Sequence, residues 1–127
     1  SLRLFYFYGL EQSSSRRYAI MVPMKNNDAS AVESASSKIY VGVCIDTACT
    51  LGVCAERNAI FNMITNGEDA IGVFAVNWKG EAIPPCGACR EFMAQLMPED
   101  YRSIEIMMDQ EKERVVTLGN LTPEWWL

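Results

Sequence analysis

Apolar residues occupy every second position between residues 38 and 46. These positions are Ile39, Val41, Val43 and Ile45. Because successive side chains of a strand point to opposite faces of a sheet, this period of two predicts a strand with one apolar face. Cys44 and Asp46 then share the opposite face of the predicted strand, and their side chains point in the same direction.

The apolar residues that follow are spaced as in two helices. The first helix is expected to begin after Gly52 and to end at Gly67, and its apolar side consists of Ala55, Ala59, Ile60, Met63 and Ile64. The second helix begins near Cys86 and ends before Pro98, because proline cannot continue a helix. Its apolar side consists of Ala88, Phe92, Met93 and Leu96.

Three further segments have the character of strands, at residues 71–77, 103–108 and 114–117. Near the N-terminus we expect a helix before residue 18, a strand at either 18–22 or 29–33, and an apolar segment at 4–10 that packs on the core. Strands that alternate with helices imply an α/β domain, and the two short late strands favour a mixed sheet. The 127 residues fit a single domain spanning positions 1–127.

Composition narrows the possible functions. The formal net charge is −5, which argues against nucleic acid or an anionic membrane surface as a partner. The chain has neither an apolar run of about 20 residues nor the basic start of a signal peptide, so we expect a cytoplasmic protein. It contains five cysteines and no histidine. Catalysis by Ser-His-Asp or Cys-His is therefore excluded, and the cysteines are expected to be free thiols or metal ligands.

Three of the cysteines stand at the starts of the two predicted helices, in Cys-Ala-Glu at 54–56 and Pro-Cys-Gly-Ala-Cys at 85–89. A helix N-terminus carries about half a positive charge, which stabilises the thiolate form that binds zinc. We therefore expect Cys54, Cys86 and Cys89 to bind Zn²⁺ and to leave its fourth position to water. This combination is the signature of zinc deaminases, in which a glutamate that is not a ligand moves protons, here Glu56.

Arg57 directly follows that glutamate and has two possible roles. Three thiolates on Zn²⁺ form a centre of net charge −1, which is a weaker Lewis acid than a site that contains histidine. Arg57 could donate hydrogen bonds to a thiolate and offset this charge. Equally, it could be an ordinary exposed arginine on a helix.

These motifs resemble the cytidine deaminase family, specifically its small three-cysteine, homotetrameric kind. The resemblance covers residues 38–126 and includes segments 54–60, 85–91 and 121–125. It implies a three-layer α/β/α sandwich around a five-stranded mixed sheet, and a homotetramer whose active sites border neighbouring subunits. It further implies zinc-dependent hydrolysis of cytidine or deoxycytidine to the uridine product and ammonia, in pyrimidine salvage. The Ala55 N–H would bind the base carbonyl, and the region of Pro85 would receive the amine.

One departure from the family concerns the residues expected to bind the sugar. The family carries Asn-x-Glu at the end of the strand that precedes the metal-binding helix, and both of these side chains hold the ribose. At the corresponding positions this chain has Cys44 and Asp46. Cysteine is a weak hydrogen-bond partner and aspartate is one methylene shorter, so a modified nucleoside such as blasticidin S is an alternative substrate. Cys44 could equally be a small buried apolar residue, whereas Asp46 is expected to keep a substrate role. The cysteines are also compatible with a closed four-sulfur zinc site that includes Cys44 or Cys49, and with a redox dithiol.

Overall fold

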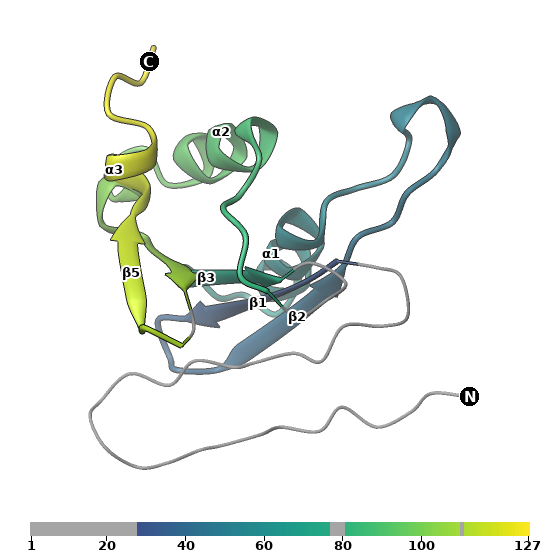
Figure 1. Cartoon of the computed structure of the whole chain (residues 1–127), viewed down its shortest axis with the longest axis horizontal. Coiled ribbons are helices and arrows are strands. Elements are labelled where there is room, and N and C mark those ends of the chain that lie inside the picture. Colours follow the sequence, from purple (N-terminus) through teal and green to yellow (C-terminus); the bar gives the residue numbers. More distant parts are fainter. Residues whose placement is uncertain (1–27, 77–80, 110) are drawn as a thin grey trace.

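The computed structural model describes residues 28–76, 81–109 and 111–127 (Figure 1). Its strands are β1 (Ala29–Ser34), β2 (Ile39–Val43), β3 (Ala70–Val76), β4 (Glu105–Asp109) and β5 (Arg114–Thr117). Its helices are α1 (Ala55–Thr65), α2 (Gly87–Leu96) and α3 (Leu118–Leu121), with short 3₁₀ turns η1 (Ala48–Thr50) and η2 (Tyr101–Ser103). None of the described helices combines the length and the apolar run that a membrane span needs.

The strands form one five-stranded sheet in the order β2-β1-β3-β4-β5. Strands β3 and β4 are parallel, and the other neighbouring pairs are antiparallel. The predicted α/β class is therefore confirmed. Of the two positions considered for the first strand, 29–33 matches β1, whereas 18–22 lies outside the described residues.

Helices α1, α2 and α3 pack against the same face of the sheet (Figure 1). Their buried side chains form one cluster with residues of β1 and β4, including Val32, Ile60, Met93 and Ile106. The opposite face carries a smaller buried cluster of Ala29, Ala31 and Met107. The predicted N-terminal helix and the apolar segment at 4–10 lie outside the described residues. A helical layer on that opposite face therefore stays a prediction.

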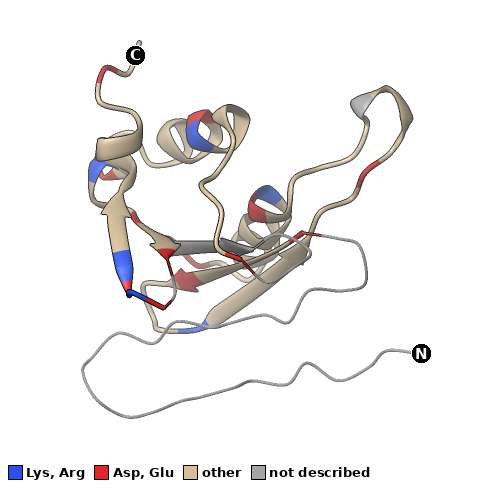
Figure 2. Ribbon diagram, viewed as in Figure 1, with Lys and Arg blue, Asp and Glu red and all other residues tan. Residues whose placement is uncertain are grey.

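Charged residues are distributed over several elements. Figure 2 shows lysine and arginine separated from one another along the described chain, with acidic residues between them. Within the described residues the ribbon therefore carries no continuous basic stripe.

Strand β2 ends earlier than its alternating pattern predicts. The last backbone hydrogen bond toward β1 is donated by the Cys44 N–H to the Asp28 carbonyl, at 2.9 Å. Ile45 then pairs with Val53 in an isolated bridge, with two backbone hydrogen bonds of 2.9 Å. Gly52 permits this pairing, because a Cβ on it would lie 1.7 Å from the Ile45 carbonyl oxygen. The prediction that the strand continues through Ile45 is thus wrong, since this residue pairs with the segment that leads into α1.

Helix α1 lies directly on the backbone of β2. Gly42 is buried beneath it, and a Cβ there would lie 2.2 Å from the Ala59 amide nitrogen and 2.7 Å from the Ala55 carbonyl oxygen. The Asn58 side-chain amide also donates to the Val43 carbonyl at 3.0 Å. This close approach fixes the first turn of α1 against the end of β2.

Replacing Gly42 with alanine is expected to destabilise the fold by about 3 kcal/mol, the upper part of the usual range for overpacking. The clashing atoms belong to the α1 backbone, so they cannot rotate away as a side chain would. Denaturant unfolding measures the effect. Gly87→Ala is the matched control, because a Cβ at that position meets nothing within 4 Å. Equal unfolding midpoints for the two variants would contradict the close approach.

A charged cluster joins the end of α1 to the turn between β1 and β2. The Glu68 carboxylate accepts a hydrogen bond from the Ser36 hydroxyl at 2.7 Å and forms an ion pair with Lys38 at 3.3 Å. Hydrogen bonds, the strongest from Ser36, lower the pKa of Glu68 from 4.5 to about 2. The ionised carboxylate therefore favours the folded state.

Replacing Glu68 with glutamine is expected to lower the Tm at pH 7. Because the folded pKa lies below the unfolded value, the stabilisation is fully present above about pH 4.5 and is lost as the pH falls toward 2. The difference in Tm between wild type and variant should therefore shrink as the pH is lowered below 4.5. Calorimetry across this range measures it, with Glu111→Gln in the exposed β4–β5 turn as the control. A difference that stays constant with pH would contradict this role for Glu68.

Candidate functional site

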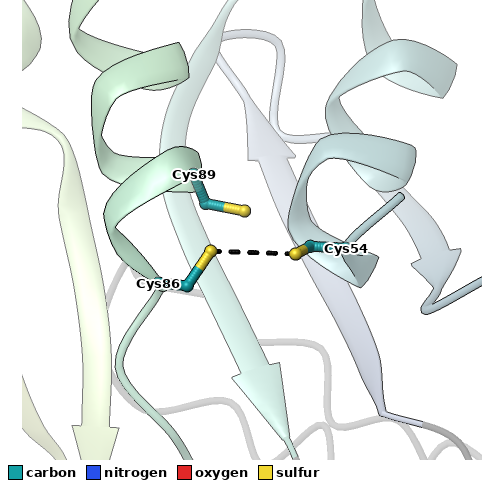
Figure 3. Close-up of side chains that lie close together, drawn as sticks. All are labelled: Cys54, Cys86 and Cys89. Atoms are coloured by element: carbon teal, nitrogen blue, oxygen red, sulfur yellow. Dashed lines mark hydrogen bonds between the residues drawn. The ribbon is translucent and has the colours of Figure 1, made fainter. Parts of the chain in front are cut away.

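Three cysteines converge at the starts of the two long helices (Figure 3). Cys54 is the N-cap of α1, Cys86 is the N-cap of α2, and Cys89 lies in the first turn of α2. Their Sγ atoms all lie within 4.8 Å of one another. The Sγ atoms of Cys54 and Cys86 are 3.7 Å apart, although the two residues are 32 positions apart in the chain. The structure thus brings together the residues that the sequence predicts as metal ligands.

The local backbone leaves these thiols free to bind a metal. Both N-cap residues are extended, and neither side chain caps its own helix. The Cys54 carbonyl accepts the Asn58 N–H at 3.1 Å and the Cys86 carbonyl accepts the Arg90 N–H at 3.0 Å, so each helix starts at its cysteine. The unpaired N–H groups of both first turns add positive potential at this point. The helix starts therefore supply a favourable field for thiolates.

The spacing of the sulfurs fits zinc. Tetrahedral zinc with Zn–S bonds of about 2.3 Å places two sulfurs about 3.8 Å apart, close to the 3.7 Å between Cys54 and Cys86. Among the described residues, neither Cys44 nor Cys49 nor any carboxylate joins the group. This geometry favours three sulfur ligands over the closed four-sulfur alternative. Cys86 is also exposed, whereas Cys89 is fully buried, so the cluster lies at the edge of the core.

The three thiols influence one another strongly. Burial raises the pKa of the Cys89 thiol, and the negative charges of Glu56, Cys86 and Cys54 raise it further. Burial also acts to raise the pKa of Cys86, but hydrogen bonds from the Cys89 backbone and from neighbouring thiols lower it overall. Three thiolates without a counterion are therefore unfavourable here. A divalent cation would remove this repulsion.

Glu56 lies in the first turn of α1, beside the sulfur cluster. Its side chain is only 6% exposed. Burial raises the pKa of Glu56, while hydrogen bonds with its own backbone and with the Cys89 side chain partly counteract this shift. A buried carboxyl with a raised pKa can both accept and return a proton closer to neutral pH. Its position and its titration therefore suit proton transfer at the cluster.

Arg57 points toward the thiols. Its Nη2 lies 3.8 Å from the Cys54 Sγ, and hydrogen bonds with Cys54 and then Cys89 raise the pKa of the guanidinium. Its Nε is buried and has no hydrogen-bond partner among the described residues. These contacts favour the charge-offsetting interpretation of Arg57 over an exposed surface arginine.

Cys44 and Asp46 lie beyond the end of β2, so the argument that they share one face of a strand does not apply to them. Cys44 is half-buried, and burial, followed by the charge of Cys54, raises the pKa of its thiol. Asp46 and Glu56 contribute to the same shift, which places Cys44 near the site. Asp46 is exposed. Of this pair, Cys44 is therefore the residue nearer the sulfur cluster, and Asp46 is the residue exposed to solvent.

The two remaining predicted substrate contacts flank the ligands. Ala55 is the first residue of α1 and is buried, so its N–H belongs to the unpaired group at the helix start. Pro85 is fully buried, and its carbonyl accepts a hydrogen bond from Arg90 Nε at 2.9 Å. The sequence assigned no role to Arg90 or to its neighbour Glu91. No local pattern marks their contacts with the C-terminal segment, because these contacts join residues more than 30 positions apart.

Comparisons with known proteins agree with this geometry. No family model matches the chain. Cytidine deaminase from Halalkalibacterium halodurans is 44% identical over 50 residues, which cover 39% of this chain and 38% of the relative. Cytidine deaminase from Mycoplasma genitalium is 33% identical over 72 residues, which cover 54% of this chain and 55% of the relative. The chain thus spans between 38% and 55% of the curated relatives that it matches.

Solved structures extend the similarity over most of the chain. Cytidine deaminase from Mycobacterium leprae superposes with a TM-score of 0.66 at 25% identity, covering 77% of this chain and 79% of that one. Cytidine deaminase from Burkholderia pseudomallei gives a TM-score of 0.66 at 26% identity, with 79% and 81% covered. Similarity in sequence and in fold therefore leads to the same group of proteins.

Proposed function

We propose that this chain, which is similar to cytidine deaminases in sequence and in fold, catalyses the zinc-dependent hydrolytic deamination of a cytidine-type nucleoside. Cytidine or deoxycytidine would be converted to uridine or deoxyuridine with release of ammonia. The observation that carries this proposal is the grouping of three cysteine sulfurs within 4.8 Å at two helix starts, with the buried Glu56 beside them.

Cys54, Cys86 and Cys89 would hold the Zn²⁺ ion. When bound through three protein ligands, zinc lowers the pKa of a water at its open position to near neutrality and so supplies the nucleophile. Arg57 offsets the excess negative charge of the three thiolates through its contact with Cys54. This contact also holds the first turn of α1 against its own cysteine.

Glu56 carries the protons of the reaction. It accepts a proton from the attacking water and delivers it to ring nitrogen N3, which makes C4 more electrophilic. After the C4–O bond has formed, Glu56 takes the remaining proton from the oxygen added at C4 and passes it to the amino group. The C4–N bond breaks and ammonia leaves, so the net change is the replacement of an amino group by oxygen. Burial suits Glu56 to this shuttle because it raises the carboxyl pKa toward neutrality.

The substrate would be oriented by groups around the sulfur cluster. The free N–H of Ala55 donates to the base carbonyl, and the region of Pro85 receives the departing amine. Cys44 and Asp46 face the sugar, with Asp46 as the hydrogen-bonding residue. A modified nucleoside such as blasticidin S is the second candidate, because the half-buried Cys44 offers the sugar a weaker partner than an amide.

The decisive experiment measures zinc content and ammonia release together. The zinc-loaded protein is incubated with cytidine, deoxycytidine, cytosine and blasticidin S. About one zinc per chain and turnover of cytidine or deoxycytidine are expected. Turnover of blasticidin S alone would favour the second candidate, and zinc-loaded protein that releases ammonia from none of the four would overturn the proposal.

The assembly and the cellular role are proposed from the same resemblance to small three-cysteine cytidine deaminases. We propose a homotetramer that acts on free nucleosides in cytoplasmic pyrimidine salvage. Light scattering coupled to size-exclusion chromatography would give the mass of the assembly, and a value equal to one chain would contradict the tetramer.

A further inference from the structure

The C-terminal segment is fastened to helix α2 by side chains. We define residues 121–126 as the C-terminal strap. The Leu121 carbonyl accepts a hydrogen bond from Arg90 Nη1 at 3.3 Å. The indole N–H groups of Trp125 and Trp126 donate to the two carboxylate oxygens of Glu91, at 3.0 and 2.7 Å. Two consecutive residues of α2 thus hold both ends of the strap.

Glu91 acts as a clamp, because one carboxylate binds two adjacent indoles. The Trp125 ring also packs on the buried Tyr101, with ring centroids 5.0 Å apart. Trp126 is 71% exposed, so its indole bond to Glu91 is the described contact that orients it. Gln95 donates to the same carboxylate at 2.6 Å, and among the described residues it forms no hydrogen bond with the strap. Loss of Glu91 would therefore remove the hydrogen bonds of both indoles at once.

Arg90 connects the strap to the start of α2. Its Nε donates to the Pro85 carbonyl at 2.9 Å, while its Nη1 reaches the Leu121 carbonyl. Pro85 directly precedes Cys86, the exposed member of the sulfur cluster. Because a guanidinium is planar and rigid, its two hydrogen bonds fix the relative positions of the two carbonyls. Movement of the strap would therefore be transmitted to the peptide that carries Cys86.

Glu91, which binds both indoles, does not project toward the sulfurs. Cys89 and Glu91 are two residues apart on α2, which is about 200° around the helix, so they project to opposite sides. Glu91 therefore acts on the site indirectly, through the strap that it holds. Arg90 links the strap to the site, because its side chain bonds both the Leu121 carbonyl and the Pro85 carbonyl, which directly precedes Cys86.

We propose that the C-terminal strap positions the Pro85–Cys86 half of the site, with Arg90 and Glu91 as positioning residues. The expected effect on zinc affinity rests on the zinc-binding function proposed above. The structural part of the proposal, that the strap holds the backbone at the start of α2, stands on the hydrogen bonds alone. A strap with a purely general stabilising role would act equally on all parts of the fold.

Two measurements on the intact chain test the proposal. Zinc affinity is determined by competition with a chromophoric chelator, and amide hydrogen exchange is followed at residues 90–93, whose N–H groups bond the carbonyls of the first turn of α2, as Arg90 does to Cys86 at 3.0 Å. Glu91→Ala and Arg90→Lys are expected to weaken zinc binding about tenfold, the lower end of the usual loss for an outer contact of a metal site. The milder variant Trp126→Phe removes only the exposed indole hydrogen bond to Glu91. It is expected to weaken zinc binding about threefold. All three variants should exchange faster at residues 90–93.

Two controls separate positioning from stability. Gln95→Ala removes a partner of Glu91 but leaves both indole bonds, and should behave as wild type. Glu68→Gln destabilises the distant β1–β2 turn and should leave zinc affinity and exchange at 90–93 unchanged. Wild-type zinc affinity and exchange in the strap variants, or an equal loss in Glu68→Gln, would overturn the proposal. A wild-type chain that binds no zinc would refute the proposed function, and the exchange rates would still decide the role of the strap.

Discussion

Replacing Glu56 with glutamine is expected to lower kcat by about 10²- to 10⁴-fold, the usual contribution of general acid–base catalysis. Glutamine has the same shape but can neither accept nor return a proton. Zinc content should remain at the wild-type level, because Glu56 does not belong to the ligand group. Steady-state ammonia release and metal analysis of the same sample measure the two effects.

The control for this variant is Glu68→Gln, which removes a carboxylate from the other end of the α1 region. Its turnover at pH 7 should match that of wild type. Full activity in Glu56→Gln protein that retains zinc would show that another group moves the proton. Loss of zinc together with activity would instead assign Glu56 to the ligand set.

Replacing Cys89 with alanine is expected to weaken zinc binding about 100-fold and to abolish turnover at ordinary zinc concentrations. A structural zinc site contributes about 10–16 kcal/mol over four ligands, so one ligand contributes about 3 kcal/mol. Alanine suits this position because Cys89 is fully buried, and a serine hydroxyl would lack a partner there. Chelator competition and ammonia release measure the two losses.

Cys49→Ser is the matched control, because Cys49 is exposed and does not belong to the sulfur group. It should bind zinc and turn over substrate as wild type does. An unchanged zinc affinity in Cys89→Ala would contradict the three-ligand site. It would also revive the alternative in which Cys86 and Cys89 form a redox dithiol.

Features that depend on neighbours in the chain could be predicted from the sequence. The period of two at Ile39, Val41 and Val43 predicted β2, and the positions of Gly52 and Pro85 predicted the starts of α1 and α2 within a few residues. Convergence of the cysteines was also predictable, because a motif at each helix start requires two helix N-termini to meet. Such signals are local, because they set the conformation of a segment wherever that segment packs in the fold.

Features that depend on distant packing could not be predicted. The alternating pattern continues to Ile45, yet this residue turns to pair with Val53, since Gly52 lets two backbones approach. The positions of Cys44 and Asp46 follow from this turn and not from the period of the strand. Likewise, Arg90 and Glu91 are ordinary polar residues of a helix in the sequence. Their roles appear only when the C-terminal segment lies beside them.

The two helix N-caps have a consequence for folding as well as for chemistry. An ion held by both Cys54 and Cys86 would join positions 32 residues apart and act as a cross-link. By analogy with a disulfide, closing a loop of that length lowers the entropy of the unfolded chain by an amount equivalent to roughly 4 kcal/mol. The population of folded chains would then follow the free zinc concentration. Zinc scarcity would deplete the protein itself, and not only its turnover.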